Sequence, residues 1–212
     1  MKFYLISPPF EQKNFNKDIF DKITDIINVT HFQIRPKYEK KEQNRLFAEK
    51  SLINYKKLCQ KKKITFLLND DVYLCKKLGY DGVHLGQKDM CCKQAREILG
   101  NDSVVGISCK NKISLAKKAK DEGADYVAFG PVYSSRTKTQ ANETLDIDII
   151  TSNKDEMSLP FTLIGGINHE NIFKILRTGA MNFSVIDSIW NFKEGPIKSA
   201  LYFKNIRNKY EN

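Results

Sequence analysis

The chain contains few residues of the kinds that build disulfide frameworks and metal clusters. Five cysteines, three histidines and one tryptophan occur among its 212 residues. The cysteines have neither the spacing of a zinc site nor that of a secreted disulfide framework. No apolar run reaches the roughly 20 residues that cross a bilayer. A strand-like segment begins directly after Met1 and leaves no room for a signal peptide, so we expect reduced thiols and a soluble, cytoplasmic protein.

Acidic side chains are outnumbered by basic ones, 25 to 35, which gives a formal net charge of +10. A nucleic-acid-binding surface would require basic residues interleaved with aromatic residues on one face. The lysines are instead scattered in short clusters such as Lys40-Lys41 and Lys61-Lys62-Lys63, in contexts typical of solvated helices and turns. We therefore expect no nucleic-acid partner and no membrane contact, although the excess charge would help to attract anionic substrates.

Short apolar runs alternate along the whole chain with segments whose apolar residues recur three and four positions apart, as in a helix. This alternation indicates right-handed βαβ crossovers and a parallel sheet. Eight such units close a (β/α)₈ barrel. The predicted fold class is therefore α/β, a single TIM-barrel domain with a closed parallel sheet over residues 1–212. The predicted strands are 3–6, 31–35, 65–68, 82–85, 104–107, 126–129, 161–164 and 182–186.

Three helix-to-strand returns share one pattern, in which a glycine suited to the left-handed C-cap conformation is followed at once by a strand. They occupy residues 78–83, 122–127 and 178–183. Their recurrence favours repeated units over two unlike domains. The alternative is an open doubly wound sheet, which would need a glycine-rich phosphate turn after its first strand. That strand runs into Ser7-Pro8-Pro9-Phe10 instead, so the closed barrel is favoured.

Acidic side chains follow two successive predicted strands where each strand ends. Asn69-Asp70 comes after strand 65–68, and Asp89 follows strand 82–85. In a parallel barrel the carboxyl ends of the strands share one rim, where such folds carry their chemistry. Converging carboxylates suit Mg²⁺, which takes one or two of them and leaves its other positions to water and substrate phosphate. Either aspartate could instead cap the next helix, although Asp71 is also available for the first cap.

Basic side chains follow other predicted strands on the same rim. In Gln33-Ile34-Arg35-Pro36-Lys37 the alternate residues are polar and share one face of an extended segment. Pro36 lacks the amide proton of a ladder residue, which indicates that the strand ends here. Arg35 and Lys37 could then grip a polyphosphate, the first as a planar fork and the second as a point charge. Together with the acids, they predict a magnesium–pyrophosphate site.

A polar stretch at 134–142 follows a predicted strand and is a candidate lid over this rim. It supplies hydroxyl groups from Ser135 and Thr137 and a cation from Lys138. Closure of such a loop would exclude water and strengthen the electrostatic interactions inside. Ser108, at the end of strand 104–107, could donate to a phosphate or a heterocycle, or could be a buried turn serine.

Glycines end the seventh predicted strand, in Gly165-Gly166-Ile167-Asn168, ahead of a predicted helix containing Ile172 and Leu176. They would let backbone amides approach an anion at the helix N-terminus, and phosphate binding after strands seven and eight recurs in barrels. His84 lies within an apolar strand and is expected to be a packed residue instead of a ligand. No Ser–His–Asp or Cys–His arrangement stands out, so nucleophilic catalysis is not predicted.

Several of these segments, in this order, resemble the thiamine phosphate synthase family over essentially the whole chain. The resemblance implies a (β/α)₈ enzyme that couples hydroxymethylpyrimidine diphosphate with a thiazole phosphate to give thiamine phosphate and pyrophosphate. The segments that carry it are Gln33-Ile34-Arg35-Pro36-Lys37, Asn69-Asp70, Asp81-Gly82-Val83-His84-Leu85-Gly86-Gln87-Lys88-Asp89, Gly106-Ile107-Ser108, Gly123-Ala124-Asp125-Tyr126-Val127, Thr137-Lys138 and Ile164-Gly165-Gly166-Ile167.

The resemblance also implies roles for particular residues and small phosphorylated molecules as partners. In the family mechanism pyrophosphate leaves first, so that a metal and cations dominate catalysis and no general base is required. The roles are: Mg²⁺ ligands Asp70 and Asp89; catalytic and pyrophosphate-binding residues Arg35, Lys37, Asn69 and Lys138; a pyrimidine contact Gln33; further pocket residues Ser108 (also catalytic), Ser135 and Thr137; and thiazole-phosphate contacts Gly166, Ile186 and Asp187.

Some positions depart from the family pattern. Pro36 stands where the family usually has glutamate, the segment 38–45 lacks the expected glycine, and Ser135 replaces a threonine. The family's eighth strand ends in a valine or isoleucine followed by serine, whereas this chain has Ile186-Asp187. A carboxylate beside a phosphate is repulsive unless it points away or is protonated. Ser188 could take the serine's place if the loop shifted by one residue.

The departure at Asp187 leaves two alternatives. One is a thiazole tautomerase, a related branch that tends to lose the metal acids and to gain a histidine near the position after Ser108. This chain keeps both acids and has Cys109-Lys110 there, which favours the synthase. The other is a non-catalytic phosphate-ligand binding protein with a decayed thiazole site. The sequence leaves open whether the chain forms a homo-oligomer.

Overall fold

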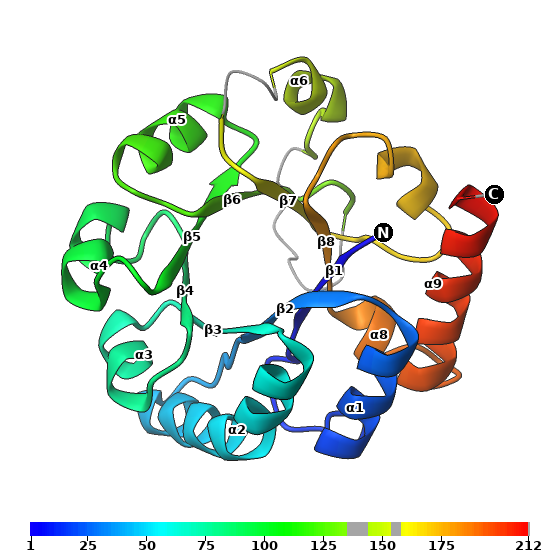
Figure 1. Ribbon diagram of the computed structural model, residues 1–212, viewed down its shortest axis with the longest axis horizontal. Coiled ribbons are helices and arrows are strands. Elements are labelled where there is room, and N and C mark those ends of the chain that lie inside the picture. The colour runs from blue at the N-terminus through cyan, green and yellow to red at the C-terminus, as the bar shows by residue number, and fades with distance from the viewer. Residues whose placement is uncertain (135–143, 154–157, 212) are drawn as a thin grey trace.

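The computed structural model describes residues 1–134, 144–153 and 158–211. Its strands form a closed parallel barrel in which each strand pairs with the next and β8 pairs with β1. The helices surround this ring on the outside (Figure 1). The predicted (β/α)₈ fold is confirmed. The strands are β1 (Phe3–Ile6), β2 (Val29–Ile34), β3 (Thr65–Asn69), β4 (Gly82–Leu85), β5 (Val104–Lys110), β6 (Tyr126–Phe129), β7 (Phe161–Ile164) and β8 (Asn182–Val185).

Helices follow most of the strands and return the chain to the start of the next one. The glycines that end three of these returns, Gly79, Gly123 and Gly179, have positive φ angles of 71°, 90° and 79°. This is the left-handed conformation that their pattern predicts. The helices are α1 (Lys17–Ile26), α2 (Lys41–Lys62), α3 (Val72–Leu78), α4 (Cys92–Leu99), α5 (Ile113–Asp121), α6 (Ile147–Ser152), the 3₁₀ turn η1 (Ile172–Ile175), α8 (Asp187–Trp190) and α9 (Pro196–Glu211).

The segment after β7 differs from the prediction. The apolar spacing predicts a helix, but the structure contains only the 3₁₀ turn η1. Asparagine side chains organise the approach to this turn: Asn171 Oδ1 accepts from the Asn168 amide at 2.9 Å, and Asn168 Oδ1 accepts from the Glu170 amide at 2.9 Å. Such local bonds compete with helical backbone pairing. The predicted helix is therefore wrong, and one 3₁₀ turn lacks the aligned dipoles of a helix. That Gly166 contacts a phosphate stays a prediction.

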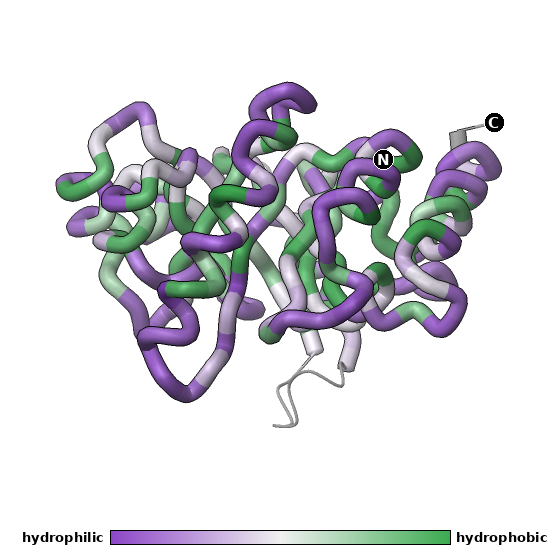
Figure 2. Tube along the Cα trace, turned by 90° about the horizontal axis from the view of Figure 1, so that it is seen from below, coloured by the Kyte–Doolittle hydropathy of each residue, from purple (hydrophilic) through white to green (hydrophobic). Residues whose placement is uncertain are grey.

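Aromatic side chains fill the layer between the strands and the outer helices. The ring of Phe20 in α1 stacks on that of Phe32 in β2 with centroids 4.3 Å apart, and Tyr55 of α2 packs edge-on against both. Full burial of such a side chain contributes roughly 1.5–3 kcal/mol relative to exposure. Seen from the side, hydrophobic stretches concentrate in the middle of the molecule and hydrophilic ones in the turns and along the outer helices (Figure 2). This layer packs the outer helices against the ring of strands.

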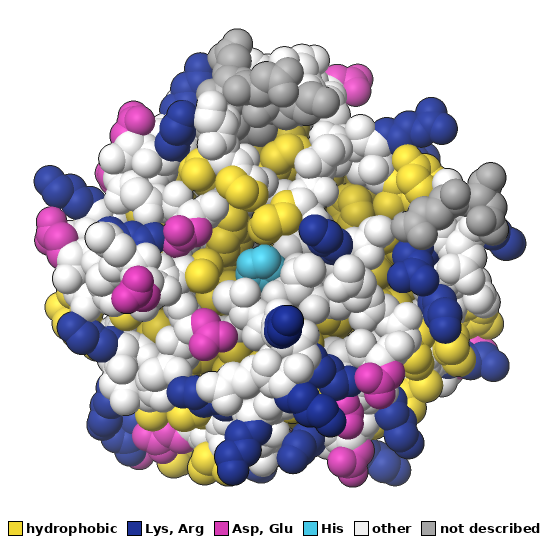
Figure 3. Space-filling view, viewed as in Figure 1, with side chains coloured by type: hydrophobic (Ala, Val, Ile, Leu, Met, Phe, Trp, Pro, Cys, Tyr) yellow, Lys and Arg dark blue, Asp and Glu magenta, His cyan; other side chains and the backbone are white. Residues whose placement is uncertain are grey.

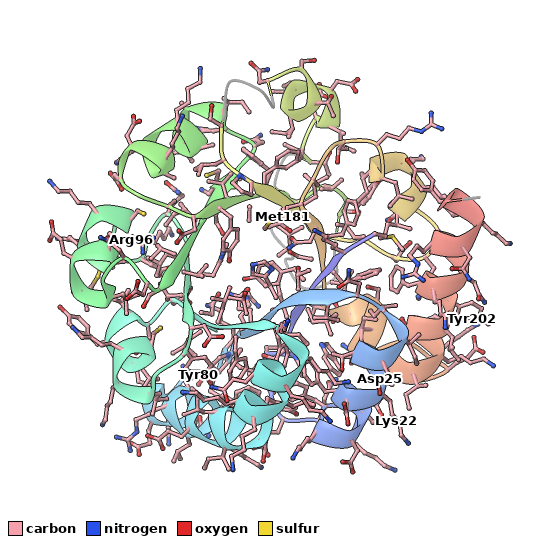
Figure 4. All side chains as sticks on the ribbon, viewed as in Figure 1. Lys22, Asp25, Tyr80, Arg96, Met181 and Tyr202 are labelled. Atoms are coloured by element: carbon pink, nitrogen blue, oxygen red, sulfur yellow. The ribbon has the colours of Figure 1, made fainter. Side chains whose placement is uncertain are left out.

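The inside of the ring is a separate and partly polar layer. A small cluster of Tyr4, Ile6, Leu67 and Tyr126 packs there, with Met181 against it. Met181 precedes β8 and lies within the ring in Figure 4. The N-terminus lies on the face shown in Figures 1 and 3, where hydrophobic side chains and a histidine occupy the centre of a charged rim. The strands run away from this face, so their carboxyl ends lie at the opposite one.

Two further predictions concern the whole chain: that its thiols are reduced and that no segment crosses a membrane. All five cysteines are free, and four of them are buried. Among the described residues, no helix combines the length and the apolar composition that crossing a lipid bilayer requires.

Candidate active site at the carboxyl ends of the strands

Asp70 follows β3 in a backbone conformation that is unusual for a residue with a side chain. Its φ angle is 66°, in the left-handed region, which aspartate tolerates better than most residues. The Asp70 amide donates to the carbonyl of His84 at 2.9 Å, which ties the turn to the neighbouring strand β4. A strained conformation of this kind costs on the order of 1–3 kcal/mol and is concentrated at functional sites. The turn directs the Asp70 side chain away from the helix that follows.

Helix capping does not account for Asp70. The adjacent Asp71 is the N-cap of α3, and its Oδ1 accepts from the Leu74 amide at 2.8 Å. The same holds for Asp89, because the N-cap position of α4 is Cys91. Asp89 instead closes a turn, its Oδ2 accepting from the Gly86 amide at 2.7 Å. The alternative interpretation of both acids as helix caps is therefore wrong.

The carboxyl groups of Asp70 and Asp89 are neighbours within hydrogen-bonding reach. Burial raises the pKa of Asp89, and the charge of Asp70 and the hydrogen bond to it raise that pKa further. Two neighbouring carboxyl groups could hold a cation, because a bound cation removes the repulsion between them. Among the described residues, no third acid, histidine or cysteine joins them. Two carboxylates with no further protein ligand fit Mg²⁺, which keeps water and phosphate in its other positions.

Cationic side chains reach the same acids from the segment after β2. Lys37 Nζ lies 2.5 Å from Asp70 Oδ2, and both side chains are partly exposed. The side chain of Arg35 is partly buried; burial lowers its pKa, and the charge of Asp70 opposes this effect. The backbone that carries them is fixed by hydrogen bonds from the Arg35 amide to Ser7 Oγ at 2.8 Å and from the Lys37 amide to the Pro9 carbonyl at 3.0 Å. The segment Ser7–Pro9, which lacks the glycines of a phosphate loop, therefore supports the cations.

Polar side chains at the ends of three strands complete the described part of the site. Gln33 Nε2 donates to Asn69 Oδ1 at 2.6 Å. Ser108 Oγ lies 2.8 Å from Nε2 of His84, which is buried inside the ring as expected. The Ser108 carbonyl also accepts from Gln87 Nε2 at 2.7 Å. The side chains predicted from β2, β3 and β5 thus meet at one rim.

The chain after β7 makes a close backbone approach at two glycines. Gly165 and Gly166 have positive φ angles of 105° and 64°. A Cβ atom at Gly166 would lie 2.7 Å from the carbonyl oxygen of Ser134 and 2.8 Å from Cβ of Tyr133. Such contacts exclude any side chain. The glycine pair therefore lets the segments after β6 and β7 approach each other closely.

The carboxylate of Asp187 is held within its own helix. Its Oδ1 accepts from Asn191 Nδ2 at 2.8 Å, one turn further along α8. Ile186 precedes it with φ of −129° and ψ of −84°, and packs against the cluster inside the ring. The Ser188 hydroxyl, the predicted substitute, is buried and has no hydrogen-bond partner within the part of the chain that the structure describes. Both Ile186 and Asp187 thus lie directly after β8, where the thiazole-phosphate contacts are predicted.

Three predicted residues, Ser135, Thr137 and Lys138, lie outside the described residues, as does most of the predicted lid at 134–142. Conversely, the structure adds two residues that the sequence analysis did not single out, Tyr4 and Tyr126. Their hydroxyl groups lie 2.8 Å apart inside the ring, between Gln33 and His84. A tyrosine at an inward-facing strand position was the available signal, because a buried hydroxyl needs a partner.

A (β/α)₈ barrel that gathers two acids, two cations and amide groups at the carboxyl ends of its strands belongs to the class of barrel enzymes acting on phosphorylated small molecules. Within that class, the family profile described as "Thiamine monophosphate synthase" matches residues 3–189. The chain belongs to this family. It is 41% identical over 194 residues to the thiamine-phosphate synthase of Pelagibacter ubique, covering 90% of this chain and 89% of the relative.

Two further comparisons agree with this assignment. The thiamine-phosphate synthase of Rhodospirillum centenum is 34% identical over 206 residues, and 97% of each chain is covered. Among solved structures, the thiamine phosphate pyrophosphorylase from Pyrococcus furiosus superposes with a TM-score of 0.78, covering 98% of this chain and 96% of that one. At 22% identity the latter similarity establishes the fold alone.

Proposed function

We propose that the chain is a Mg²⁺-dependent thiamine phosphate synthase, joining hydroxymethylpyrimidine diphosphate to a thiazole phosphate. The bond between the pyrimidinylmethyl carbon and the diphosphate oxygen breaks, and pyrophosphate leaves with the electron pair. The thiazole nitrogen then supplies the pair that forms the new carbon–nitrogen bond. The observation that carries the proposal is the meeting of Asp70 and Asp89 beside Arg35 and Lys37.

The described residues can stabilise the departing charge. Asp70 and Asp89 would hold Mg²⁺, which would neutralise charge on the leaving pyrophosphate. Arg35 offers a planar fork of donors, and its burial makes each of its hydrogen bonds stronger than it would be in water. Lys37 offers a point charge that can move between Asp70 and a phosphate oxygen. Since no proton has to be removed, the absence of a general base among these residues is consistent with the reaction.

The tautomerase alternative is disfavoured at the position where that branch carries a histidine. Cys109 is fully buried, and burial raises the pKa of its thiol to about 12. A thiol in this environment cannot serve as a base near neutral pH. The pair of acids that the branch tends to lose is present.

The decisive experiment is incubation of the purified protein with both substrates, with and without Mg²⁺. We expect stoichiometric release of pyrophosphate and thiamine phosphate only when the metal and both substrates are present. Isomerisation of the thiazole without metal would support the tautomerase, and tight ligand binding with neither reaction would support the binding protein.

A further inference from the structure

A continuous chain of hydrogen bonds runs through the inside of the ring and connects Asn69, at the end of β3, with Ser108 in β5. It begins at Asn69, passes through Gln33, Tyr4 and Tyr126, and continues to His84 and Ser108. The four central side chains, from Gln33 to His84, are at most 8% exposed. The five contacts, in the same order, measure 2.6, 3.1, 2.8, 2.8 and 2.8 Å.

The hydrogen bonds of this chain have a common direction, because each hydroxyl has one proton. Gln33 Oε1 can only accept, so Tyr4 donates to it. The Tyr4 oxygen must then accept from Tyr126, and the Tyr126 oxygen must accept from His84 Nδ1–H. A neutral His84 consequently has an unprotonated Nε2, which accepts from Ser108 Oγ–H.

Only one other arrangement satisfies every group, and it reverses all five bonds together. In the reversed chain Asn69 would present its carbonyl oxygen to the rim, and Ser108 would be free to donate. Asn69 lies beside Asp70, Lys37 and Arg35, where an anionic diphosphate is proposed to bind, and an anion requires N–H donors. The direction seen in the structure leaves the Asn69 amide N–H groups available, so a bound diphosphate selects it.

The backbone leaves room for this chain at one particular position. A Cβ atom at Gly106 in β5 would lie 2.0 Å from Cζ and 2.3 Å from the hydroxyl oxygen of Tyr126. Any other residue at 106 would displace the Tyr126 ring from its place between Tyr4 and His84. The Tyr126 and His84 rings also stack, with centroids 5.6 Å apart, which fixes the orientation of the imidazole.

We propose that Tyr4, Tyr126 and His84 are positioning residues that make Ser108 Oγ a hydrogen-bond acceptor toward the ligand. This inference rests on the proposed function, because the pyrimidine substrate carries an amino group that can donate to Ser108. Gln33 retains one amide N–H that can donate to a ring nitrogen. The rim then presents the Ser108 acceptor beside the Gln33 donor. This pair is complementary to an aminopyrimidine and mismatched to an oxopyrimidine.

The test uses phenylalanine substitutions that remove one hydroxyl each. In Tyr126→Phe, His84 loses the acceptor for its Nδ1–H, so it can take the other tautomer and donate from Nε2 to Ser108. Tyr4→Phe allows the same change, because the Tyr126 hydroxyl can then turn to His84 Nδ1. The matched control is Tyr80→Phe, since Tyr80 is also buried and donates to the Ala48 carbonyl at 2.8 Å. Tyr80 lies outside the ring of strands, near α2 (Figure 4).

Two measurements report on the proposal. Nitrogen NMR of the full chain gives the tautomer of His84, and titration calorimetry compares the aminopyrimidine alcohol with its oxo analogue in the presence of pyrophosphate and Mg²⁺. We expect Nδ1–H in the native protein and in Tyr80→Phe, with at least tenfold preference for the amino compound. Tyr126→Phe and Tyr4→Phe should shift the tautomer toward Nε2–H and reduce the preference to less than about threefold.

Two results would overturn the proposal: an Nε2–H tautomer in the native protein, or an unchanged tautomer and preference in Tyr126→Phe. The tautomer is measured without turnover. If the native protein shows the expected tautomer and preference but produces no thiamine phosphate, the proposed function fails while the role of the three residues stands.

Discussion

Lys37 Nζ lies 2.5 Å from Asp70 Oδ2, so the ammonium of Lys37 forms an ion pair with a carboxylate that is proposed to bind Mg²⁺. The ion pair is partly exposed, with 41% and 36% of the two side chains accessible. Pairs of this kind contribute about 0–1 kcal/mol. Lys37 can therefore leave Asp70 at little cost when a metal arrives, and its ammonium is then available to a phosphate.

Lys37→Met should consequently bind Mg²⁺ more tightly than the native protein. Removing the competing ammonium is expected to raise the affinity of the protein without substrate by a few-fold, as an ion pair of about 1 kcal/mol permits. Turnover should fall at the same time, because the pyrophosphate loses a cation. Calorimetric titration with Mg²⁺ and a steady-state assay measure the two effects. Lys50→Met is the control, since Lys50 pairs with Glu11 in an exposed ion pair that includes neither of the metal acids. Weaker Mg²⁺ binding in Lys37→Met would contradict the competition.

Neighbouring aspartates should respond differently to removal of their charge. Asp70→Asn keeps a side chain that tolerates the left-handed backbone, and we expect it to lower Mg²⁺ affinity and turnover by at least a hundredfold with little change in the thermal midpoint. Asp71→Ala should behave in the opposite way. Loss of the α3 cap costs about 1 kcal/mol of stability, while metal binding is retained. Calorimetric titration with Mg²⁺ and thermal unfolding of both variants distinguish loss of metal binding from loss of stability. If Asp70→Asn and Asp71→Ala changed Mg²⁺ affinity equally, Asp70 would no longer be assigned as a metal ligand.

The rim could be predicted from the sequence because strand ends carry a local signal. Asn69-Asp70, Asp89 and Arg35 each stand where an apolar run stops, and a parallel barrel places all strand ends at the same rim. The fold could be predicted because short apolar runs alternate with helix-like segments along the chain. Asp70 and Asp89 could therefore be placed at the same rim without knowledge of side-chain contacts.

The features that the sequence did not predict depend on contacts between distant strands. Tyr4 and Tyr126 are 122 positions apart, and their hydrogen bond arises only when the ring closes. The replacement of a helix by η1 depends on the side chains of Asn168 and Asn171, which apolar periodicity does not detect. The position of Asp187 after the eighth strand was predicted from the sequence, but its hydrogen bond with Asn191 was not.

Asp187→Ser should improve binding of the thiazole phosphate. Asp187 follows β8 directly, and its carboxylate adds negative charge near the predicted phosphate position. Removing one charge near a partly solvated phosphate is worth about 1 kcal/mol, which corresponds to a KM several-fold lower for the thiazole phosphate. The KM for the pyrimidine diphosphate should stay the same and serves as the internal control. A higher KM for the thiazole phosphate would show that the contact with Asn191 is needed to shape the site.

Stability should fall as the pH is lowered through the range in which histidines of the unfolded chain become charged. Burial lowers the pKa of both His31 and His84 from 6.5 to about 4. Between these values the unfolded chain binds more protons than the folded protein, so the free energy of unfolding decreases with decreasing pH. Each histidine contributes up to about 3 kcal/mol of this loss by pH 4. Asp89, whose pKa is raised, acts in the opposite direction where it titrates.

Urea unfolding at pH 7, 6 and 5 measures this dependence, and His31→Gln tests its origin. His31 lies close to Asn182 and Thr30, away from the acids, and glutamine keeps a polar side chain without a titrating group. We expect the variant to lose about half of the decrease in unfolding free energy between pH 7 and pH 5, whatever its stability at pH 7, because His84 alone then contributes. An unchanged decrease in His31→Gln would contradict the lowered pKa of His31. A His84 that is charged in the folded state would exclude the hydrogen-bond direction from Ser108 to His84, since a charged imidazole has no free nitrogen to accept.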